Sequence, residues 1–208
     1  MSPSIASIAI APEPQAVAPN LAQFSYRVAF PAPHTHFIEV ELAIANWDDP
    51  VLDLVFPVWT PGSYLVREYA RHVQNFSATA EGNPLPWRKQ SKNRWQVDCE
   101  ALSPDQTLTV KYRVFANELT VRTNHMDATH AYFNGACTFF YVERGGDRLD
   151  QPYDITVVLP EGWAVSTTLP KIAGDETSQT FRADDFDWVV DSPFEIGTHH
   201  VIPFEAGD

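Results

Sequence analysis

The side chains in this chain best suited to hold a metal or move a proton are its seven histidines. His34 and His36 stand two residues apart, so on a strand they would share one face and offer two ligands to a zinc ion. No third ligand is evident nearby, and a polar start to a strand explains the pair as well. His199 and His200 are adjacent, which places them on opposite faces of a strand. The sequence has no H-E-x-x-H segment, the helical motif that would supply zinc ligands and a general base.

Nucleophiles are equally scarce. There is no G-x-S-x-G elbow that would present an activated serine. Cys137 stands among phenylalanines and tyrosines, where a cysteine is typically a small buried hydrophobe, and no neighbouring His or Lys would lower its pKa. Cys99 is the only other cysteine, so a zinc knuckle or disulfide framework is excluded. Whether Cys99 and Cys137 pair with each other is left open.

Clustered carboxylates offer a third kind of chemistry. The segment DDFDWVVD (184–191) brings four aspartates together, but a calcium loop requires glycine at its sixth position and Val189 stands there. A solvated loop beside a strand is the better interpretation. The RGGDR segment (144–148) has glycines but no helix after it, so it is a poor phosphate cradle. The chain thus lacks a complete catalytic set, which suggests that the catalytic half lies elsewhere.

The stretch THAYFNGACTFFY (129–141) surrounds an Asn-Gly pair with aromatic residues. Asn-Gly between apolar runs is typical of a tight type I′ hairpin, with the aromatic rings in the core. A polar amide and a bare backbone ringed by aromatics are also typical of a small-ligand pocket. The sequence alone leaves both interpretations standing.

The elements that must position these residues are predicted to be strands. Apolar residues alternate with polar ones over 35–46 and 106–119, and further short strands are expected over 22–30, 51–59, 153–160 and 179–190. Seventeen prolines and many Gly and Asn turns separate them, and only 63–73 is a helix candidate. We therefore predict an all-β fold of two packed, twisted, mostly antiparallel sheets, a saddle-like β-sandwich with little helix. Residues 1–20 are predicted to be a flexible Ala/Pro-rich leader, and 21–208 a single domain.

Composition and charge exclude several functions. The formal net charge is −13, and fourteen acids against four bases lie between residues 141 and 208. An acidic surface repels phosphate backbones, so nucleic acid is a poor candidate partner. The apolar run near the start has no Lys or Arg before it, and nothing later has the length of a membrane span. We expect a cytoplasmic protein that does not associate with membranes.

Several segments resemble the N-terminal domain of the glycyl-aminopeptidase family of zinc metallopeptidases, which often carry a C-terminal PDZ domain. They lie between about residues 24 and 198, and the two most specific are the P-x-W-T-P-G-S-Y string (57–64) and the E-L-x-V-R…N-G string (118–135). The others are YRVAFPAPHTHF, KNRW, VLPEGW and DSPFEIG.

This resemblance implies a saddle-like β domain similar to the N-terminal domain of aminopeptidase N. In such enzymes it precedes a thermolysin-like domain that holds H-E-x-x-H and the zinc. This sequence contains neither, so the chain as given is expected to be inert by itself. Its expected partners are its own C-terminal catalytic domain and a peptide with a free N-terminus. The family name implies a preference for small first residues.

The resemblance also assigns candidate substrate-binding residues, because in related aminopeptidases a segment at a comparable place in the chain holds the free amino end. Carried over, that role falls on His130 to Gly135. Asn134 would accept a hydrogen bond from the ammonium group, and Gly135 would let a substrate backbone approach closely. Tyr132 shares parity with Asn134, so Tyr132 rather than Phe133 is expected on the pocket side, with His130 beside it.

A surface for the catalytic domain is expected near WTPGSYLVREYAR (59–71). Trp59, Tyr64 and Tyr69 are its candidate docking residues, and Arg122 with Arg67 would pair with acids across it. A purely structural role, with Trp59 in the core and Pro-Gly as a turn, is the interpretation we favour for this segment. For the arginines, surface ion pairs of small energetic value are the simpler alternative.

The rival function is a free-standing β-sandwich that binds a carbohydrate or a peptide through its Trp and Tyr residues. An exposed apolar patch of several hundred Å² would favour the peptidase domain, because a missing partner domain leaves such a surface. An aromatic platform would favour the sugar binder. A self-contained metal enzyme that uses His34 and His36 is the weakest of the three.

Overall fold

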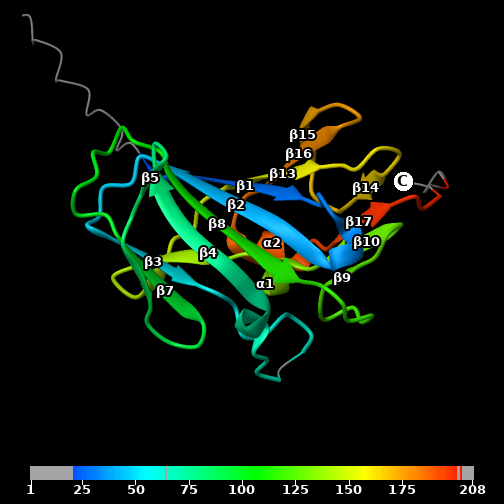
Figure 1. Ribbon diagram of the computed structural model, residues 1–208, viewed down its shortest axis with the longest axis horizontal. Helices are drawn as coiled ribbons and strands as arrows, with labels where there is room; N and C mark the ends of the chain where they lie inside the picture. The colour runs from blue at the N-terminus through cyan, green and yellow to red at the C-terminus, as the bar shows by residue number, and fades with distance from the viewer. Residues whose placement is uncertain (1–20, 64, 201, 203–208) are drawn as a thin grey trace, which may run out of the picture.

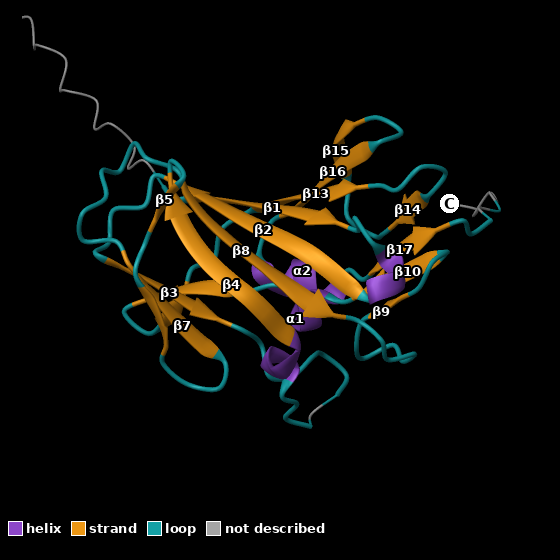
Figure 2. Cartoon of the chain, in the orientation of Figure 1, coloured by secondary structure: helices purple, strands orange, loops and turns teal. Residues whose placement is uncertain are grey.

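The all-β prediction is confirmed. The structure, a computed structural model, describes residues 21–63, 65–200 and 202; the predicted leader (1–20) and Tyr64 lie outside the described residues. Three sheets make up the fold (Figures 1 and 2). A large sheet packs over a five-stranded sheet as the predicted sandwich, and a four-stranded sheet, which the sequence did not reveal, lies at one end.

The large sheet has eight strands, and its centre is β1 (Gln23–Ala29). β1 pairs in antiparallel fashion with β2 (Phe37–Ala45) and in parallel with β13 (Tyr153–Val158). Burial alternates along β2 as the sequence predicts. The remaining strands are β8 (Leu108–Phe115), β4 (Val73–Ala80) and β5 (Asn83–Pro84) beyond β2, and β16 (Ser178–Ala183) and β15 (Lys171–Gly174) beyond β13.

The two smaller sheets are antiparallel. The five-stranded sheet runs in the order β12 (Asp147–Arg148), β11 (Tyr141–Arg144), β3 (Val51–Val55), β7 (Arg94–Asp98) and β6 (Trp87–Lys89). The four-stranded sheet runs in the order β14 (Ala164–Ser166), β17 (Phe194–Gly197), β10 (His130–Phe133) and β9 (His125–Met126).

The core between the layers is largely aromatic. Tyr26 and Tyr112 project from the large sheet, and their hydroxyls donate to the backbone carbonyls of Phe140 and Thr138, the second at 2.8 Å. The Phe140 ring stands edge-on to the Tyr112 and Trp95 rings, with centroids 4.9 and 5.0 Å away. The segment before β11 is therefore anchored in the middle of the sandwich.

Helices are few and short, as predicted. η1 (Pro33–Thr35) and η2 (Tyr69–His72) are 3₁₀ turns, so the helix candidate over 63–73 shortens to one turn. α1 (Gly135–Thr138) begins directly after Asn134, so the Asn-Gly pair starts a helix and the hairpin alternative is wrong. α2 (Phe186–Asp191) forms where the sequence predicted the end of a strand over 179–190 and a loop beside it, because the Asp185 carboxylate accepts from the Trp188 backbone N–H at 2.7 Å and caps the helix.

The histidine and cysteine questions are also resolved. His34 lies in η1, and His36 ends that turn with a left-handed φ of 60°, so the two do not share a strand face. Cys99 and Cys137 are both free and buried. Among the described residues, no group of three or more His, Cys, Asp or Glu is placed to hold a metal ion. Within the same residues, no helix is long and apolar enough to cross a membrane.

Candidate functional site

The strand β10 presents two of the predicted substrate-binding residues on one face. Ala131 and Phe133 are fully buried, whereas His130 and Tyr132 on the opposite face are half-buried. The expectation that Tyr132 rather than Phe133 lies on the open side agrees with this alternation. Register with β17 pairs Tyr132 with Glu195, which brings a carboxylate to the same face.

These side chains line a depression of about 210 Å³. Its polar wall is formed by His130, Tyr132 and Glu195, together with His125 from β9. The Nε2 atom of His130 pairs with the Glu195 carboxylate, and the His125 and His130 ring centroids are 5.8 Å apart. The opposite wall is apolar and belongs to the loop 117–124. We call this hollow the β10 depression.

Sequence reasoning did not single out Glu195. It lies in the DSPFEIG segment that carries part of the family resemblance, but its position opposite Tyr132 depends on how β17 pairs with β10. Cross-strand neighbours follow from register, which a single sequence does not specify for short strands.

His125 is held by a neighbouring carboxylate. Its Nε2 atom lies 3.4 Å from Asp127 Oδ2, and its Nδ1 atom is buried without a hydrogen-bond partner among the described residues. The backbone N–H of Thr129 donates a hydrogen bond to the Asp127 carboxylate, and the Thr129 hydroxyl, the His125 ring and the His130 backbone N–H donate further ones. Together these bonds lower the pKa of Asp127 to about 2. Asp127 therefore stays ionised beside the β10 depression at neutral pH.

Asn134 and Gly135 lie beneath this depression and are already engaged. The Asn134 side-chain oxygen accepts from the Ala136 backbone N–H at 2.9 Å, which caps α1, and the residue is only 8% exposed. A Cβ at Gly135 would lie 2.5 Å from the Val189 carbonyl oxygen. The backbone that approaches Gly135 is thus that of α2.

The loop 117–124 is clamped from beneath by the α1 segment. The buried Asn124 side chain donates to the Cys137 carbonyl at 3.2 Å. The Cys137 thiol donates to the Arg122 carbonyl at 3.0 Å, and the Tyr132 hydroxyl donates to the Val121 carbonyl, also at 3.0 Å. Hydrogen bonds from three side chains therefore fix the position of this loop, which forms one wall of the depression.

Large apolar side chains stand exposed around this site. Leu119 and Val121 are 82% and 77% exposed, and Leu65 and Val66 in the neighbouring loop are 63% and 71% exposed. An ion pair of 3.0 Å between Arg71 and Glu118 ties the two segments together. We call these four residues the apolar rim. All four are large apolar side chains that stand open to solvent in the described part of the chain.

The structure places the predicted docking residues in different surroundings. Trp59 is 51% exposed, so the favoured core role does not hold for it, although Pro61 and Gly62 do form the expected turn with a Thr60–Ser63 bond of 3.0 Å. Tyr69 is 3% exposed and packs inside. Arg122 is exposed, and Tyr64 lies outside the described residues.

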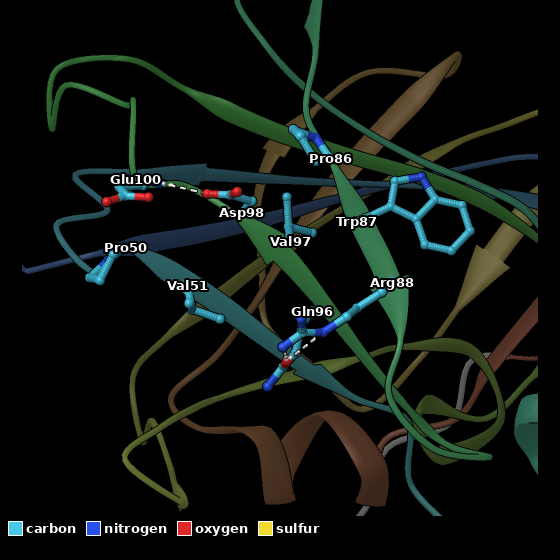
Figure 3. A pocket seen from close by; sticks show the side chains of 9 residues that line it. All are labelled: Pro50, Val51, Pro86, Trp87, Arg88, Gln96, Val97, Asp98 and Glu100. Carbon is cyan, nitrogen blue, oxygen red and sulfur yellow. Dashed lines mark hydrogen bonds between the residues drawn. The ribbon is translucent and has the colours of Figure 1, made fainter.

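A second hollow, of about 320 Å³, lies on the outer face of the five-stranded sheet (Figure 3). Its polar residues are partly engaged with each other, since the Nε and Nη2 atoms of Arg88 donate to the side-chain Oε1 atom of Gln96 at 3.2 and 2.7 Å. The Trp87 ring points away from Gln96 and Val51 and packs on Phe76 with centroids 4.8 Å apart. Trp87 is 44% exposed and is the aromatic side chain that lines this hollow.

The sequence was compared with known families and proteins. Residues 25–198 match the Peptidase M61 N-terminal domain. Among curated proteins, no sequence matches this chain.

The fold recurs in solved structures. A protein from Idiomarina loihiensis, described as belonging to the aminopeptidase N family, superposes with a TM-score of 0.75 at 34% identity, over 84% of this chain and 29% of that protein. An M1 zinc metallopeptidase from Deinococcus radiodurans superposes with a TM-score of 0.48 at 12% identity, over 85% of this chain and 42% of that one. The chain therefore spans less than half the length of either protein.

Proposed function

Because this chain belongs to the peptidase M61 N-terminal domain family, we propose that it is the non-catalytic N-terminal domain of a zinc aminopeptidase. In this proposal it supplies part of the substrate-binding wall and a docking surface for a C-terminal, thermolysin-like catalytic domain. In this proposal the zinc is held by that catalytic domain. When bound there, zinc activates a water molecule and polarises the scissile carbonyl.

The observation that carries the proposal is the β10 depression, which combines a carboxylate with an apolar wall. A peptide with a free N-terminus brings an ammonium group that would donate to Glu195, while the Tyr132 hydroxyl borders the same space. The Leu119 and Val121 side chains would contact the aliphatic part of the peptide. Asn134, whose side-chain oxygen caps α1, acts in this proposal as a positioning residue.

Contact with the catalytic domain is assigned to the apolar rim. Burial of four exposed apolar side chains gives an interface a hydrophobic centre, which Arg122 and Trp59 would border. β17 is the last strand in the described part of the chain, and its Gly197 lies opposite His130, so it ends beside the β10 depression.

The test is Glu195→Gln in the full-length enzyme. Loss of the ammonium–carboxylate interaction, worth about 1.5–3 kcal/mol, should raise KM for unblocked peptides by roughly 10- to 100-fold. The matched control is Glu161→Gln, which removes one negative charge from an exposed turn. An unchanged KM in a folded Glu195→Gln enzyme would refute the assignment of the amine site.

A further inference from the structure

Another hollow in the described part of the chain lies apart from the β10 depression and shares none of its residues. It is a groove of about 480 Å³ between the outer face of β11, the helix α2 and the loop 57–61. Three aromatic side chains contribute to its walls: Trp59 from the loop, Tyr141 from β11 and Phe186 from α2. We call it the Trp59 groove.

Trp59 is held out at the edge of this groove by a rigid loop. Prolines at positions 57 and 61 limit the backbone on either side. The Arg67 N–H donates to the Val58 carbonyl at 2.6 Å, and a bond of 3.0 Å closes the turn after Thr60. About half of the Trp59 surface is exposed to solvent, and because the loop already fixes the backbone, binding a partner would cost little further conformational entropy. These properties are typical of an interface anchor.

The walls of the groove carry an excess of negative charge. Four carboxylates line it, from Glu143, Asp147, Asp150 and Asp187, against the single guanidinium of Arg148. That guanidinium is engaged, because it binds Asp187 with two bonds of 2.7 and 2.8 Å. No ion pair links Asp147 to a cation among the described residues.

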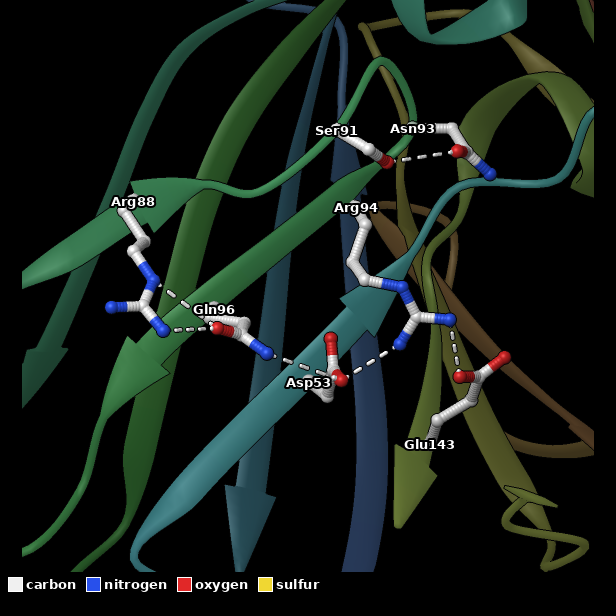
Figure 4. A network of polar contacts seen from close by, with 7 residues as sticks. All are labelled: Asp53, Arg88, Ser91, Asn93, Arg94, Gln96 and Glu143. Atoms are coloured by element: carbon white, nitrogen blue, oxygen red, sulfur yellow. Dashed lines mark hydrogen bonds and ion pairs between the residues drawn. The ribbon is translucent and has the colours of Figure 1, made fainter. Parts of the chain in front are cut away.

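The strands beside Glu143 are also short of cations. Arg94 lies between Asp53 and Glu143, with N–O distances of 2.7 and 2.5 Å, so one guanidinium serves two carboxylates (Figure 4). The Asp53 Oδ1 atom is buried and has no hydrogen-bond partner among the described residues. The negative charge of the groove walls is therefore not balanced by cations on the neighbouring strands.

We propose that the Trp59 groove binds an arginine-bearing segment of a partner polypeptide. A guanidinium is planar and weakly hydrated, so it stacks on the indole of Trp59 while its N–H groups donate to carboxylates such as Asp147. The excess of acidic groups selects a cation, and the exposed indole of Trp59 selects a flat cation carried on an apolar stem. An inorganic cation would use the carboxylates alone and would gain nothing from Trp59.

The test titrates the 208-residue chain with acetyl-tetraarginine amide and follows the tryptophan indole N–H resonances by NMR. Trp59→Phe identifies the Trp59 resonance, which distinguishes the groove from general attraction to an acidic protein. The matched probe is acetyl-tetracitrulline amide, which has almost the same shape without the charge. The expected result is a saturable shift of the Trp59 resonance with arginine and none with citrulline.

Variants then locate the contact. Trp59→Ala should weaken binding about 10-fold, as the loss of a cation–π contact of 1–2 kcal/mol implies, and Asp147→Asn should weaken it several-fold. Glu161→Gln, which removes the same charge far from the groove, should leave the affinity unchanged. Equal binding of the citrulline peptide, displacement by millimolar Ca²⁺, or unchanged affinity in Trp59→Ala would each overturn the proposal.

Discussion

At the scale of single residues, the two thiols show how burial controls reactivity. Cys137 is 4% exposed and its pKa is raised by burial to about 12, while burial raises the pKa of Cys99 to about 11. A thiol is reactive only as its thiolate, and a raised pKa removes thiolate at neutral pH. Cys137 also donates to the Arg122 carbonyl, so its sulfur is in contact with the wall of the β10 depression.

Both thiols should therefore resist iodoacetamide in the folded chain at pH 8. With a pKa of about 12, the thiolate fraction of Cys137 is roughly one in ten thousand at that pH, and it rises as the pH rises toward the pKa. Labelling is measured by mass spectrometry, with the chain unfolded in guanidinium chloride as the fully reactive control. Rapid alkylation of Cys137 in the folded chain would show that the loop 117–124 opens readily.

The sequence placed some residues of the site and not others. The two-residue period of a strand was enough to put His130 and Tyr132 on one face and Phe133 on the other. It did not find Glu195, which faces Tyr132 only because of the β10–β17 register. Sequence reasoning assigned the Asn134 side-chain oxygen to a substrate ammonium group, whereas in the structure this oxygen accepts from the Ala136 backbone N–H. The cap was not foreseen because an asparagine before glycine caps a helix as readily as it turns a hairpin.

At the scale of elements, α1 links the site to the rest of the molecule. It is one turn long, yet it clamps the loop 117–124 above and contacts α2 below. Its first residue, Gly135, lies where the backbones of the two helices meet. The loop that walls the β10 depression is thus anchored on a helix that in turn packs against α2.

Gly135→Ala should consequently destabilise the fold. A methyl group 2.5 Å from the Val189 carbonyl oxygen must push backbone atoms apart, which costs about 1–3 kcal/mol of the free energy of unfolding. Urea denaturation of the chain measures this cost. Gly162→Ala is the control: its φ is 76° and nothing lies within 4 Å of the new methyl, so it reports backbone strain without a clash. A Gly135→Ala variant as stable as wild type would show that α1 and α2 separate easily.

Element types were predictable where the pattern was long. β2 and β8 alternate over nine and eight residues, and the sequence predicted both. α2 has six residues, which is too few for a helical period to show in the sequence, and its acidic composition is typical of a loop. The Asp185 cap that starts this helix depends on a local hydrogen bond to the Trp188 N–H. The Pro-His-Thr turn of η1 was likewise hidden in what resembled the polar start of a strand.

At the scale of the whole molecule, the apolar rim is a group of exposed apolar side chains on an acidic protein. Its four side chains are 63–82% exposed in a protein of net charge −13. Two loops distant in sequence bring them together, and the Arg71–Glu118 ion pair holds those loops side by side. The fold class followed from composition and strand pattern, but this juxtaposition did not, because it depends on tertiary contacts.

Replacing the rim residues with serine should reduce self-association of the chain without unfolding it. The side chains are exposed, so Leu65→Ser, Val66→Ser, Leu119→Ser and Val121→Ser together should leave the melting temperature within a few degrees of wild type. Sedimentation velocity should show weaker association by about 10-fold, as loss of apolar contact implies. The control is Ile172→Ser on the edge strand β15, which removes an exposed apolar residue elsewhere. Unchanged association in the fourfold variant would argue against the rim as a docking surface.

The position of β1 has a consequence for biosynthesis. β1 lies between β2 and β13, and its parallel partner begins only at Tyr153. On the ribosome, β1 and β2 can pair early, but the other edge of β1 stays open until most of the chain has been made. Pairing across so long a separation is slow, and an open edge invites contact with other chains. Chaperone contacts during synthesis should therefore concentrate on the interval before residues 153–158 leave the exit tunnel.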